Sequence, residues 1–312
     1  MCKHVTILLS TYNGELFLDE QIDSLLNQTY DDWELLIRDD GSTDNTISII
    51  KYYADDNPKI TFINENNIQN IGVVSSFIEL LHYKNSDFYM FCDQDDFWKN
   101  HKIETVVNEA LNCEKEEPLL IYTDLEVVDN ELNQISCSML NGKAFDKFNN
   151  LLVENTITGC TVLINQSLKS KVLKKDSEID KLIMHDWWLG LIASAFGTVV
   201  SMDEPTILYR QHGNNAVGAL SIGNKIRRFF QLKNNLNRVN KSFKQAEHLY
   251  SLYSKEMPTD KLRILEEYLL LQNTSILNKY SLMKKNDFKK NGLIKNIYFI
   301  LIVCFFVNSK AS

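Results

Sequence analysis

The stretch 87–96 constrains the fold more than any other part of this chain. An apolar run rich in aromatic residues ends abruptly in Asp93-Gln-Asp-Asp96. Short continuous apolar runs are typical of buried strands in parallel sheets, and open α/β sheets bind ligands beyond the carboxyl ends of such strands. Crowded carboxylates repel one another, and a divalent cation removes that repulsion. The alternative is an acidic surface turn that caps a helix beginning near Lys99.

The surrounding sequence predicts a series of strand–turn–helix units. We expect strands at 4–9, 33–37, 59–63, 87–92, 119–122, 156–164, 198–201 and 205–209, and helices at 15–28, 44–54, 72–83, 99–113, 166–174 and 185–196. Residues 123–150 are expected to be irregular and to cover a site, and Gly159 to allow a close approach to the backbone. This alternation predicts an α/β fold with a mainly parallel, Rossmann-like sheet flanked by helices.

Charge and strand content divide the chain into two predicted domains, a catalytic domain at 1–220 and a basic helical region at 221–312. Residues 223–312 hold 17 Lys+Arg against 6 Asp+Glu, whereas residues 1–222 hold 16 against 35. A basic tail suits an anionic surface such as the inner face of a membrane. Nucleic acid is not expected as a partner, because the acidic body would repel it.

The tail contains two segments suited to a membrane surface. In 225–245 apolar and basic residues interleave, as in a helix that lies on anionic lipid; the alternative is a helix packed on the catalytic domain with a solvated basic face. The 11 apolar residues of 297–307 are too few for a bilayer span, which needs about 20. They predict a monotopic anchor or a packed helix.

The cysteines and the start of the chain bear on its location. The six cysteines show no metal-type spacing, which favours reduced thiols in a cytosolic protein. The first strand begins within a few residues of Met1, so we expect no signal peptide. The predicted location is the cytoplasm, with peripheral attachment to the cytoplasmic face of the plasma membrane.

Four polar clusters each follow an apolar segment, and their order and spacing carry a resemblance. They are Ser10-Thr-Tyr-Asn-Gly14, Arg38-Asp-Asp-Gly-Ser-Thr-Asp44, Asp93-Gln-Asp-Asp96 and His185-Asp-Trp-Trp188. Over about residues 3–217 the chain resembles family 2 glycosyltransferases, which have the GT-A fold; four ordered motifs are far more specific than one. The last two clusters and Arg210-Gln-His-Gly-Asn-Asn215 resemble bacterial rhamnosyltransferases of surface-polysaccharide assembly.

The resemblance implies a binding site for a nucleotide-sugar donor. Thr11 and Tyr12 correspond to the wall of the base pocket, and Asp39 and Asp40 to the carboxylates that read the pyrimidine and support the ribose. Further candidates for donor contact are Asn13, Asn70, Asp93 and Gln94. The metal, Mn²⁺ or Mg²⁺, and the diphosphate would be held by Asp95 with Asp93, and His212 would add a contact.

The resemblance also implies a reaction. Asp186 corresponds to the general base that deprotonates the acceptor hydroxyl, and a single displacement inverts the anomeric centre. The predicted reaction moves L-rhamnose from dTDP-rhamnose to a lipid-linked or polysaccharide acceptor; the alternative within the fold is a UDP-hexose donor.

Other interpretations stay open at this point. A nucleotidyltransferase also uses an acidic metal site, but 10–14 lacks the basic residue of a phosphate loop. A non-catalytic protein that binds nucleotide sugars is a third class, although Asp95 and Asp186 together argue against it. Structural roles are the alternatives for individual residues: a helix cap for Asp44, a hydrogen-bonded neighbour for His185, a core or acceptor-wall position for Trp187 and Trp188, and a structural histidine for His212.

Overall fold

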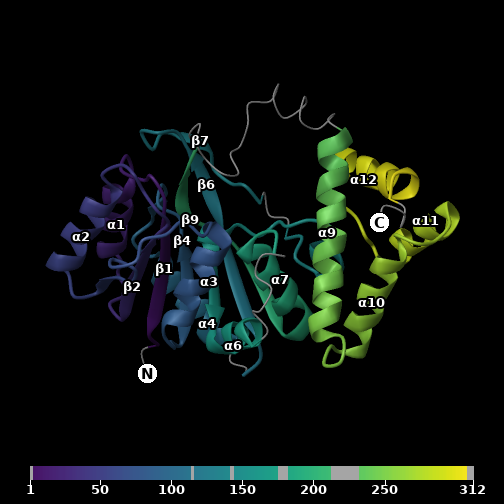
Figure 1. Ribbon diagram of the computed structural model, residues 1–312, viewed down its shortest axis with the longest axis horizontal. Coiled ribbons are helices and arrows are strands. Elements are labelled where there is room, and N and C mark those ends of the chain that lie inside the picture. Colours follow the sequence, from purple (N-terminus) through teal and green to yellow (C-terminus); the bar gives the residue numbers. More distant parts are fainter. Residues whose placement is uncertain (1–2, 114–115, 141–143, 175–181, 212–231, 308–312) are drawn as a thin grey trace.

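A single sheet crosses the catalytic part of the protein. The computed structural model describes residues 3–113, 116–140, 144–174, 182–211 and 232–307. Its strands lie in the order β3-β2-β1-β4-β8-β6-β9-β5, with β7 paired to β6 (Figure 1). Their bounds are β1 Val5–Thr11, β2 Trp33–Asp39, β3 Ile60–Phe62, β4 Phe88–Cys92, β5 Phe97–Trp98, β6 Leu119–Val128, β7 Gln134–Ser136, β8 Val162–Asn165 and β9 Thr198–Arg210.

The sheet has a parallel half and a mixed half. Strands β3, β2, β1 and β4 pair in parallel, as the strand–turn–helix pattern predicts. Strand β8 is antiparallel to both β4 and β6, and β6 is parallel to β9. The α/β class with flanking helices is confirmed, and the mixed half is what the chain pattern did not reveal.

Three local predictions were wrong. The strand expected at 156–164 is a 3₁₀ turn, η1 (Gly159–Thr161), followed by the short β8. The two strands expected between 198 and 209 are one strand, because β9 stays paired with β6 through two register shifts. Strand β6 runs to Val128, so the start of the segment expected to be irregular belongs to the sheet.

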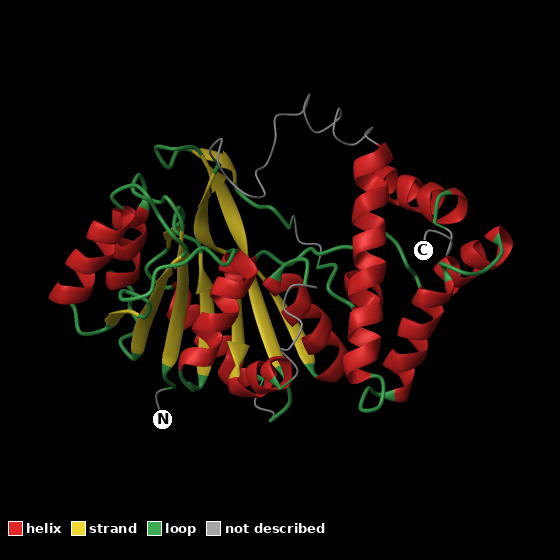
Figure 2. Ribbon diagram, in the orientation of Figure 1, coloured by secondary structure: helices red, strands yellow, loops and turns green. Residues whose placement is uncertain are grey.

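Helices cover both faces of the sheet and extend beyond one end of it (Figure 2). Their bounds are α1 Leu18–Leu26, α2 Thr46–Asp56, α3 Val73–Tyr83, α4 Lys102–Asn112, α5 Phe148–Leu151, α6 Gln166–Leu173, α7 His185–Phe196, α9 Leu232–Tyr253, α10 Thr259–Leu270, α11 Ile276–Lys285 and α12 Leu293–Phe305. Because alternate residues of β1 point to opposite faces, Ile7 and Leu9 pack with α1, α2 and α4, and Leu8 packs with α3.

The core on the α3 face continues into the C-terminal helices. Helix α7 is buried on nearly every side, and Trp188 stacks on His248 of α9 with ring centroids 5.4 Å apart. Side chains of α9, α10 and α12 belong to the same cluster as α3 and α7. The region predicted as a separate domain therefore shares its core with the sheet, and α7 and α9 lie next to each other in Figure 1.

Helix α12, which contains the apolar run of the tail, is buried on one side and exposed on the other. Phe299, Ile302 and Val303 are in the core, whereas Ile294 and Phe305 are 64% and 59% exposed. Buried Lys279 donates from Nζ to the carbonyls of Val303 and Val307, which satisfies the end of the helix. In the described part of the chain, no helix combines the length and the apolar character that crossing a membrane requires.

Candidate functional site

Three of the four polar clusters meet at one edge of the sheet. In the parallel half, Thr11 lies beside Asp39 and Leu9 lies beside Cys92. Strands β2, β1 and β4 therefore end together, and their polar turns emerge side by side, as expected for a parallel sheet. The fourth cluster joins them from the first turn of α7, since a Cβ on Gly159 would lie 3.7 Å from the Cβ of Asp186 and the next residue, Cys160, lies beside Asp93 and Asp96.

The hydrogen-bond acceptor positions of the Asp39 carboxylate are all occupied by groups of the protein itself. Its Oδ1 accepts hydrogen bonds from Thr11 Oγ1 at 2.9 Å and Ser42 Oγ at 2.6 Å. Its Oδ2 accepts from the backbone N–H groups of Gly41 and Ser42. A carboxylate has about four acceptor positions, and all four are occupied. Thr11 and Asp39 therefore shape the turn after β2, so any donor contact of Asp39 needs an exchange of these bonds.

Asp40 organises the neighbouring loop and keeps one acceptor position open. Its Oδ1 accepts from Arg38 Nη1 at 2.9 Å and from the N–H of Ile71, whereas its Oδ2 accepts, among the described residues, only from the N–H of Gly72. Arg38 is buried and also donates to Ser76, Gln69 and Glu79. Nothing in the sequence marked Arg38 as a buried centre of hydrogen bonds.

Asn70, one of the residues predicted to contact the donor, lies in this loop and is exposed. A Cβ on Gly41, which has φ of +87°, would lie 3.3 Å from the Cβ of Asn70. The 64–72 loop thus closes over the turn that contains Asp39 and Asp40, and Asn70 faces the same edge of the sheet.

The turn after β1 supplies one exposed ring, and two amide side chains connect this turn to its neighbours. Tyr12 is 52% exposed, which leaves its ring available for stacking. Gln94 accepts from Tyr12 N at 2.8 Å and donates to Tyr12 O at 3.1 Å, so it ties the acidic turn to the turn after β1. Asn13 Oδ1 accepts from Thr43 N at 2.8 Å. Gln94 and Asn13 therefore hold the loops together in this structure.

The acidic turn contains a group of atoms suited to a cation. Ligand atoms of Asp93, Asp96 and Cys160 all lie within 4.8 Å of one another. Asp96 is completely buried, and its Oδ2 has no hydrogen-bond partner among the described residues. Buried carboxylate oxygens without a partner are costly, and hard oxygen ligands suit Mg²⁺ or Mn²⁺. The residues present therefore fit a divalent cation.

This group differs from the predicted ligand set of Asp93, Asp95 and His212. Asp96 and Cys160 join Asp93, while Asp95 is next to the group in the chain but not part of it. His212 lies outside the described residues. Cys160 was missed because it is 64 residues from the turn in the chain and reaches it only through η1 and β8.

Burial and mutual repulsion both raise the pKa values of these carboxyl groups. Loss of water raises the pKa of Asp93 to about 7, with added repulsion from Asp95 and Asp186. Burial, followed by repulsion from Asp93 and Asp95, raises the pKa of Asp96 well above its usual range. A cation at this point would reverse both shifts.

Two buried basic residues, Arg210 and Lys102, lie near the acidic turn. Arg210, at the end of β9, donates from its N–H to Asp96 Oδ1 at 3.2 Å and from Nε to Asp95 O at 3.0 Å. Lys102 lies 4.6 Å from the centre of the Trp98 ring, and burial lowers its pKa to about 8. No pattern in the sequence predicted that either residue would be buried near the turn.

Asp186, the predicted base, is 7% exposed. Its Oδ1 accepts from Asn155 Nδ2 at 3.0 Å and from the N–H of Trp187 at 2.6 Å. Burial outweighs these bonds and raises the pKa of Asp186 to about 6. At neutral pH the side chain is then a carboxylate that binds a proton readily, which is what a general base requires.

His185 was expected to be a hydrogen-bonded neighbour, and this is wrong. Its ring lies between those of Phe77 and Phe91, with centroids 4.2 and 5.1 Å away, and neither ring nitrogen has a hydrogen-bond partner among the described residues. Burial lowers the pKa of His185 to about 3, so the ring is neutral. A Cβ on Gly159 would lie 3.0 Å from His185 Nε2, which confirms the predicted close approach at this glycine.

The structural alternative holds for Trp187 and Trp188. Both indoles are buried, and Trp187 Nε1 donates to Leu151 O at 2.6 Å, so they belong to the core. For Asp44 the expected helix cap is wrong, because Asn45 is the N-cap residue of α2; Asp44 Oδ1 accepts from Thr46 N at 3.0 Å and stabilises the turn that enters the helix.

Comparison with known proteins gives a consistent family. Residues 6–165 match the family model described as Glycosyl transferase family 2. The dTDP-rhamnosyl transferase RfbG of Shigella flexneri is 30% identical over 241 residues, which are 72% of this chain and 79% of that protein. The UDP-Glc:alpha-D-GlcNAc-diphosphoundecaprenol beta-1,3-glucosyltransferase WfgD of Escherichia coli is 30% identical over 165 residues, 53% of this chain and 61% of the relative.

Solved structures share the fold. S. aureus TarS 1-349 aligns over 95% of this chain and 90% of its own, with a TM-score of 0.54 and 14% identity. The mannosyltransferase PcManGT from Pyrobaculum calidifontis, in complex with GDP-Man and Mn²⁺, aligns over 97% of this chain and 79% of its own, with a TM-score of 0.53 and 14% identity. At such low identity the likeness shows the fold alone, and it confirms the predicted GT-A class.

Proposed function

This chain belongs to glycosyl transferase family 2, and we propose that it is an inverting, metal-dependent enzyme that transfers L-rhamnose from dTDP-rhamnose to a lipid-linked or polysaccharide acceptor. The proposal rests on one observation: an acidic turn suited to binding a cation lies near the candidate base Asp186 at one edge of the sheet. Gly159 packs against Asp186 and directly precedes Cys160, whose sulfur lies within 4.8 Å of Asp93 and Asp96, so the predicted base lies close to the acidic turn.

The donor would lie across the ends of β1, β2 and β4. Tyr12 offers a stacking face for the pyrimidine, and the open acceptor position on Asp40 Oδ2 can take its imide N–H. Thr11, Asn13, Asp39, Asn70 and Gln94 shape this pocket. Asp93 and Asp96, with Asp95 as the remaining carboxylate of the turn, would hold Mn²⁺ or Mg²⁺, which neutralises charge on the diphosphate leaving group when bound.

The surroundings of Asp186 suit the role of the general base in this reaction. Its carboxylate takes the proton of the acceptor hydroxyl as that oxygen attacks the anomeric carbon. The bond to the nucleoside diphosphate breaks on the opposite side, so one displacement inverts the centre. Asn155 and the N–H of Trp187 hold the carboxylate in place, and the neutral His185 adds no competing charge.

Rhamnose rests on the likeness to RfbG, whose printed name is dTDP-rhamnosyl transferase. A UDP-hexose is the second candidate donor, favoured by WfgD and by a TarS structure in complex with UDP-GlcNAc. The pyrimidine is common to both candidates, and the sugar distinguishes them.

The test is a thermal-shift screen against dTDP-, UDP- and GDP-sugars with and without Mn²⁺. Ligands that bind only the folded protein raise its melting temperature. Pyrimidine nucleotides with Mn²⁺ should stabilise the protein, and Asp40→Asn should weaken that effect while Asp55→Asn, an exposed position on α2, should not. Stabilisation by purine nucleotides alone would refute the donor assignment, and transfer that persists in excess chelator would refute the metal.

The C-terminal helices would attach the enzyme to the cytoplasmic face of the membrane. Exposed apolar side chains of α12 recur along one side, at Leu293, Ile294, Ile297, Leu301 and Phe305. Lys284 and Lys285 end the preceding helix, so basic charge lies close to this face in the chain, as in interfacial helices. Deleting 292–312 is a poor test, because it would remove core residues such as Phe299.

Vesicle co-sedimentation with single surface changes tests the attachment instead. Ile294→Glu should reduce binding to anionic vesicles about tenfold, because burying a charge in the interface is unfavourable. Tyr52→Glu, at an exposed aromatic residue of α2, is the matched control and should bind like the wild type. A wild-type chain that stays in the supernatant at low salt would contradict the attachment.

A further inference from the structure

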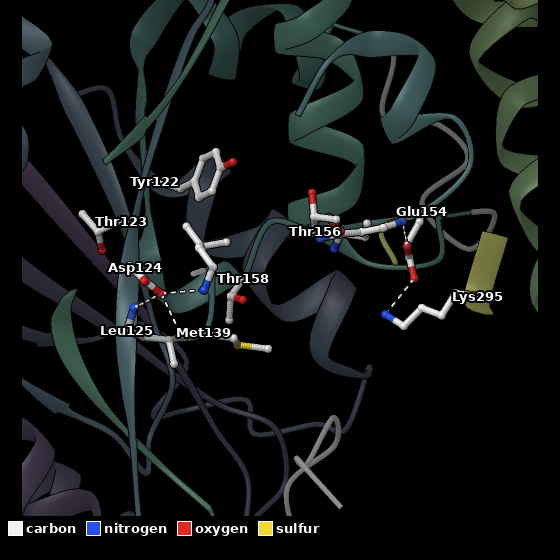
Figure 3. Close-up of a pocket in the computed structure, with 12 residues that line it drawn as sticks. Tyr122, Thr123, Asp124, Leu125, Met139, Glu154, Thr156, Thr158 and Lys295 are labelled. Atoms are coloured by element: carbon white, nitrogen blue, oxygen red, sulfur yellow. Dashed lines mark hydrogen bonds and ion pairs between the residues drawn. The ribbon is translucent and has the colours of Figure 1, made fainter. Parts of the chain in front are cut away.

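We propose that a small pocket between β6 and the start of α12 binds the terminal sugar of the acceptor as a single neutral pyranose ring. The pocket has a volume of about 190 Å³ and is lined by Asp124, Glu154, Asn155, Thr158, Asn291 and Lys295 among others. Figure 3 shows Asp124 on one side of it and the Glu154–Lys295 pair on the other. The inference rests on the proposed function, and it adds the acceptor subsite.

The pocket adjoins the base through one side chain. Asn155 lines it and donates from Nδ2 to Asp186 Oδ1 at 3.0 Å. Its Oδ1 accepts from the N–H of Ile157 at 3.1 Å, so the amide is fixed from both ends. Thr158 also lines the pocket and directly precedes Gly159, which packs against His185 and Asp186. Asp186 does not itself line the pocket, so a hydroxyl of the bound sugar would reach its carboxylate at the side where Asn155 and Thr158 lie.

The size and the walls of the pocket suit one sugar ring. Sites for drug-sized ligands measure about 300–1,000 Å³, so about 190 Å³ is enough for one ring and too small for an oligosaccharide. Leu125, Met139 and Leu140 provide apolar surface beside the polar residues. A pyranose presents the same combination, with C–H groups on its faces and hydroxyl groups on its rim.

The charges of the pocket favour a neutral sugar. Glu154 and Lys295 lie 3.5 Å apart, with side chains 18% and 56% exposed, so the pair is loose enough to exchange for hydroxyl contacts. Asp124 is already committed to the N–H groups of Met139 and Leu140, which hold the 138–140 segment at the pocket. With Asp186 close by, carboxylates outnumber the one cation, and a uronic acid would be repelled.

The C-terminal region completes this pocket. The N–H of Asn291 donates to Glu154 Oε2 at 3.0 Å, and Lys295 lies in the first turn of α12. The helix that carries the proposed membrane face therefore also supplies one wall of the acceptor site.

The experiment measures binding of methyl glycosides to the full chain by saturation-transfer NMR in the presence of dTDP and Mg²⁺. The probes are methyl α-rhamnoside, methyl α-glucoside, methyl β-N-acetylglucosaminide and methyl β-glucuronide. At least one neutral glycoside should bind, and at least tenfold more tightly than the glucuronide. Glu154→Gln and Thr158→Val should each weaken the neutral probe about fivefold or more, whereas Glu131→Gln, the same change at an exposed turn residue, should not.

A thermal shift with dTDP on each variant separates the two claims. If no pyrimidine nucleotide stabilises the wild type, the proposed function fails. If dTDP stabilises the protein but no neutral glycoside binds, or the glycoside binds Glu154→Gln and Thr158→Val as tightly as the wild type, the acceptor pocket is wrong and the proposed function stands.

Discussion

The turn after β2 and the turn after β4 lie at the same edge of the sheet, on either side of the turn after β1, and their carboxylates have opposite surroundings. Asp39 has every acceptor position filled, and Asp40 is paired with a buried arginine. Asp96 has a buried oxygen with no hydrogen-bond partner in the described part of the chain, and the pKa of Asp93 and that of Asp186 are both raised. Hydrogen bonds therefore hold the turn after β2 in one shape. The turn after β4 leaves carboxylate oxygens unsatisfied, as expected of a site that binds a ligand.

The largest effect that would break this comparison is expected at the base. Asp186→Asn keeps the shape but cannot take a proton, so the transfer rate should fall by about 10²-fold or more, while dTDP still raises the melting temperature. Asp203→Asn, at an exposed position of β9, is the control. Initial transfer rates with the two variants decide the matter. Transfer near the wild-type rate would place the base elsewhere, with Asp96 as the next candidate.

Changing Asp39 should damage folding rather than chemistry. Asp39→Ala leaves two buried hydroxyls and two N–H groups without their acceptor, which should cost about 2–4 kcal/mol of unfolding free energy. Urea denaturation measures the loss, and Asp56→Ala on α2 is the control. An unchanged midpoint would show that the two turns do not differ as described.

In the acidic turn, replacing a carboxylate should stabilise the metal-free protein, whereas replacing Asp39 should destabilise it. The pKa of Asp93 and that of Asp96 are raised in the folded protein, so the folded state holds more protons between pH 4 and 7 than the unfolded state. Stability in chelator should therefore fall as the pH rises from about 5 to 8, and Asp96→Asn should raise the melting temperature at pH 8 by a few degrees. Thermal melts with and without Mn²⁺ test this. Melting temperatures in chelator that are flat across this range, with no gain in Asp96→Asn, would contradict the prediction.

The smallest expected effect concerns the pKa of Asp186 and the pH dependence of the transfer rate. Because its pKa is about 6, kcat/KM should fall about tenfold for each pH unit well below 6. Asn155 donates to the carboxylate and lowers this pKa, so Asn155→Ala should move the acidic limb to higher pH by a fraction of a unit. Asn149→Ala, on α5 next to the C-terminal helices, should leave the limb in place. A loss of rate with no shift of the limb would mean that Asn155 acts on acceptor binding alone.

The sequence predicted what depends on neighbours along the chain. The apolar run before Asp93 and the helical spacing after Gly72 are local patterns, and parallel pairing then brought Thr11, Asp39 and Asp93 to one edge. The contacts that fill this frame are not local. Asn155 reaches Asp186 across 31 residues and Lys295 reaches Glu154 across 141. No spacing rule predicts such pairs, because they depend on how the helices dock.

The same limit explains why Asp39 and Asp96 could not be told apart in advance. Both are carboxylates at the end of an apolar strand segment. The hydroxyl of Ser42 and two N–H groups turn back onto Asp39, whereas Asp96 faces Cys160 from the far half of the sheet. The difference lies in which atoms surround each oxygen, and that is known only from the folded chain.

The core that α7 shares with α9 has a consequence for the life of the protein in the cell. A chain cut short before α9 would leave Trp188 and its neighbours on α7 facing water, since their partners His248 and Tyr253 lie in the missing helix. Proteins that expose such surface are sorted by chaperones and proteases. An incomplete translation product would therefore be cleared, and a half-built transferase would not accumulate to spend nucleotide sugar without delivering it.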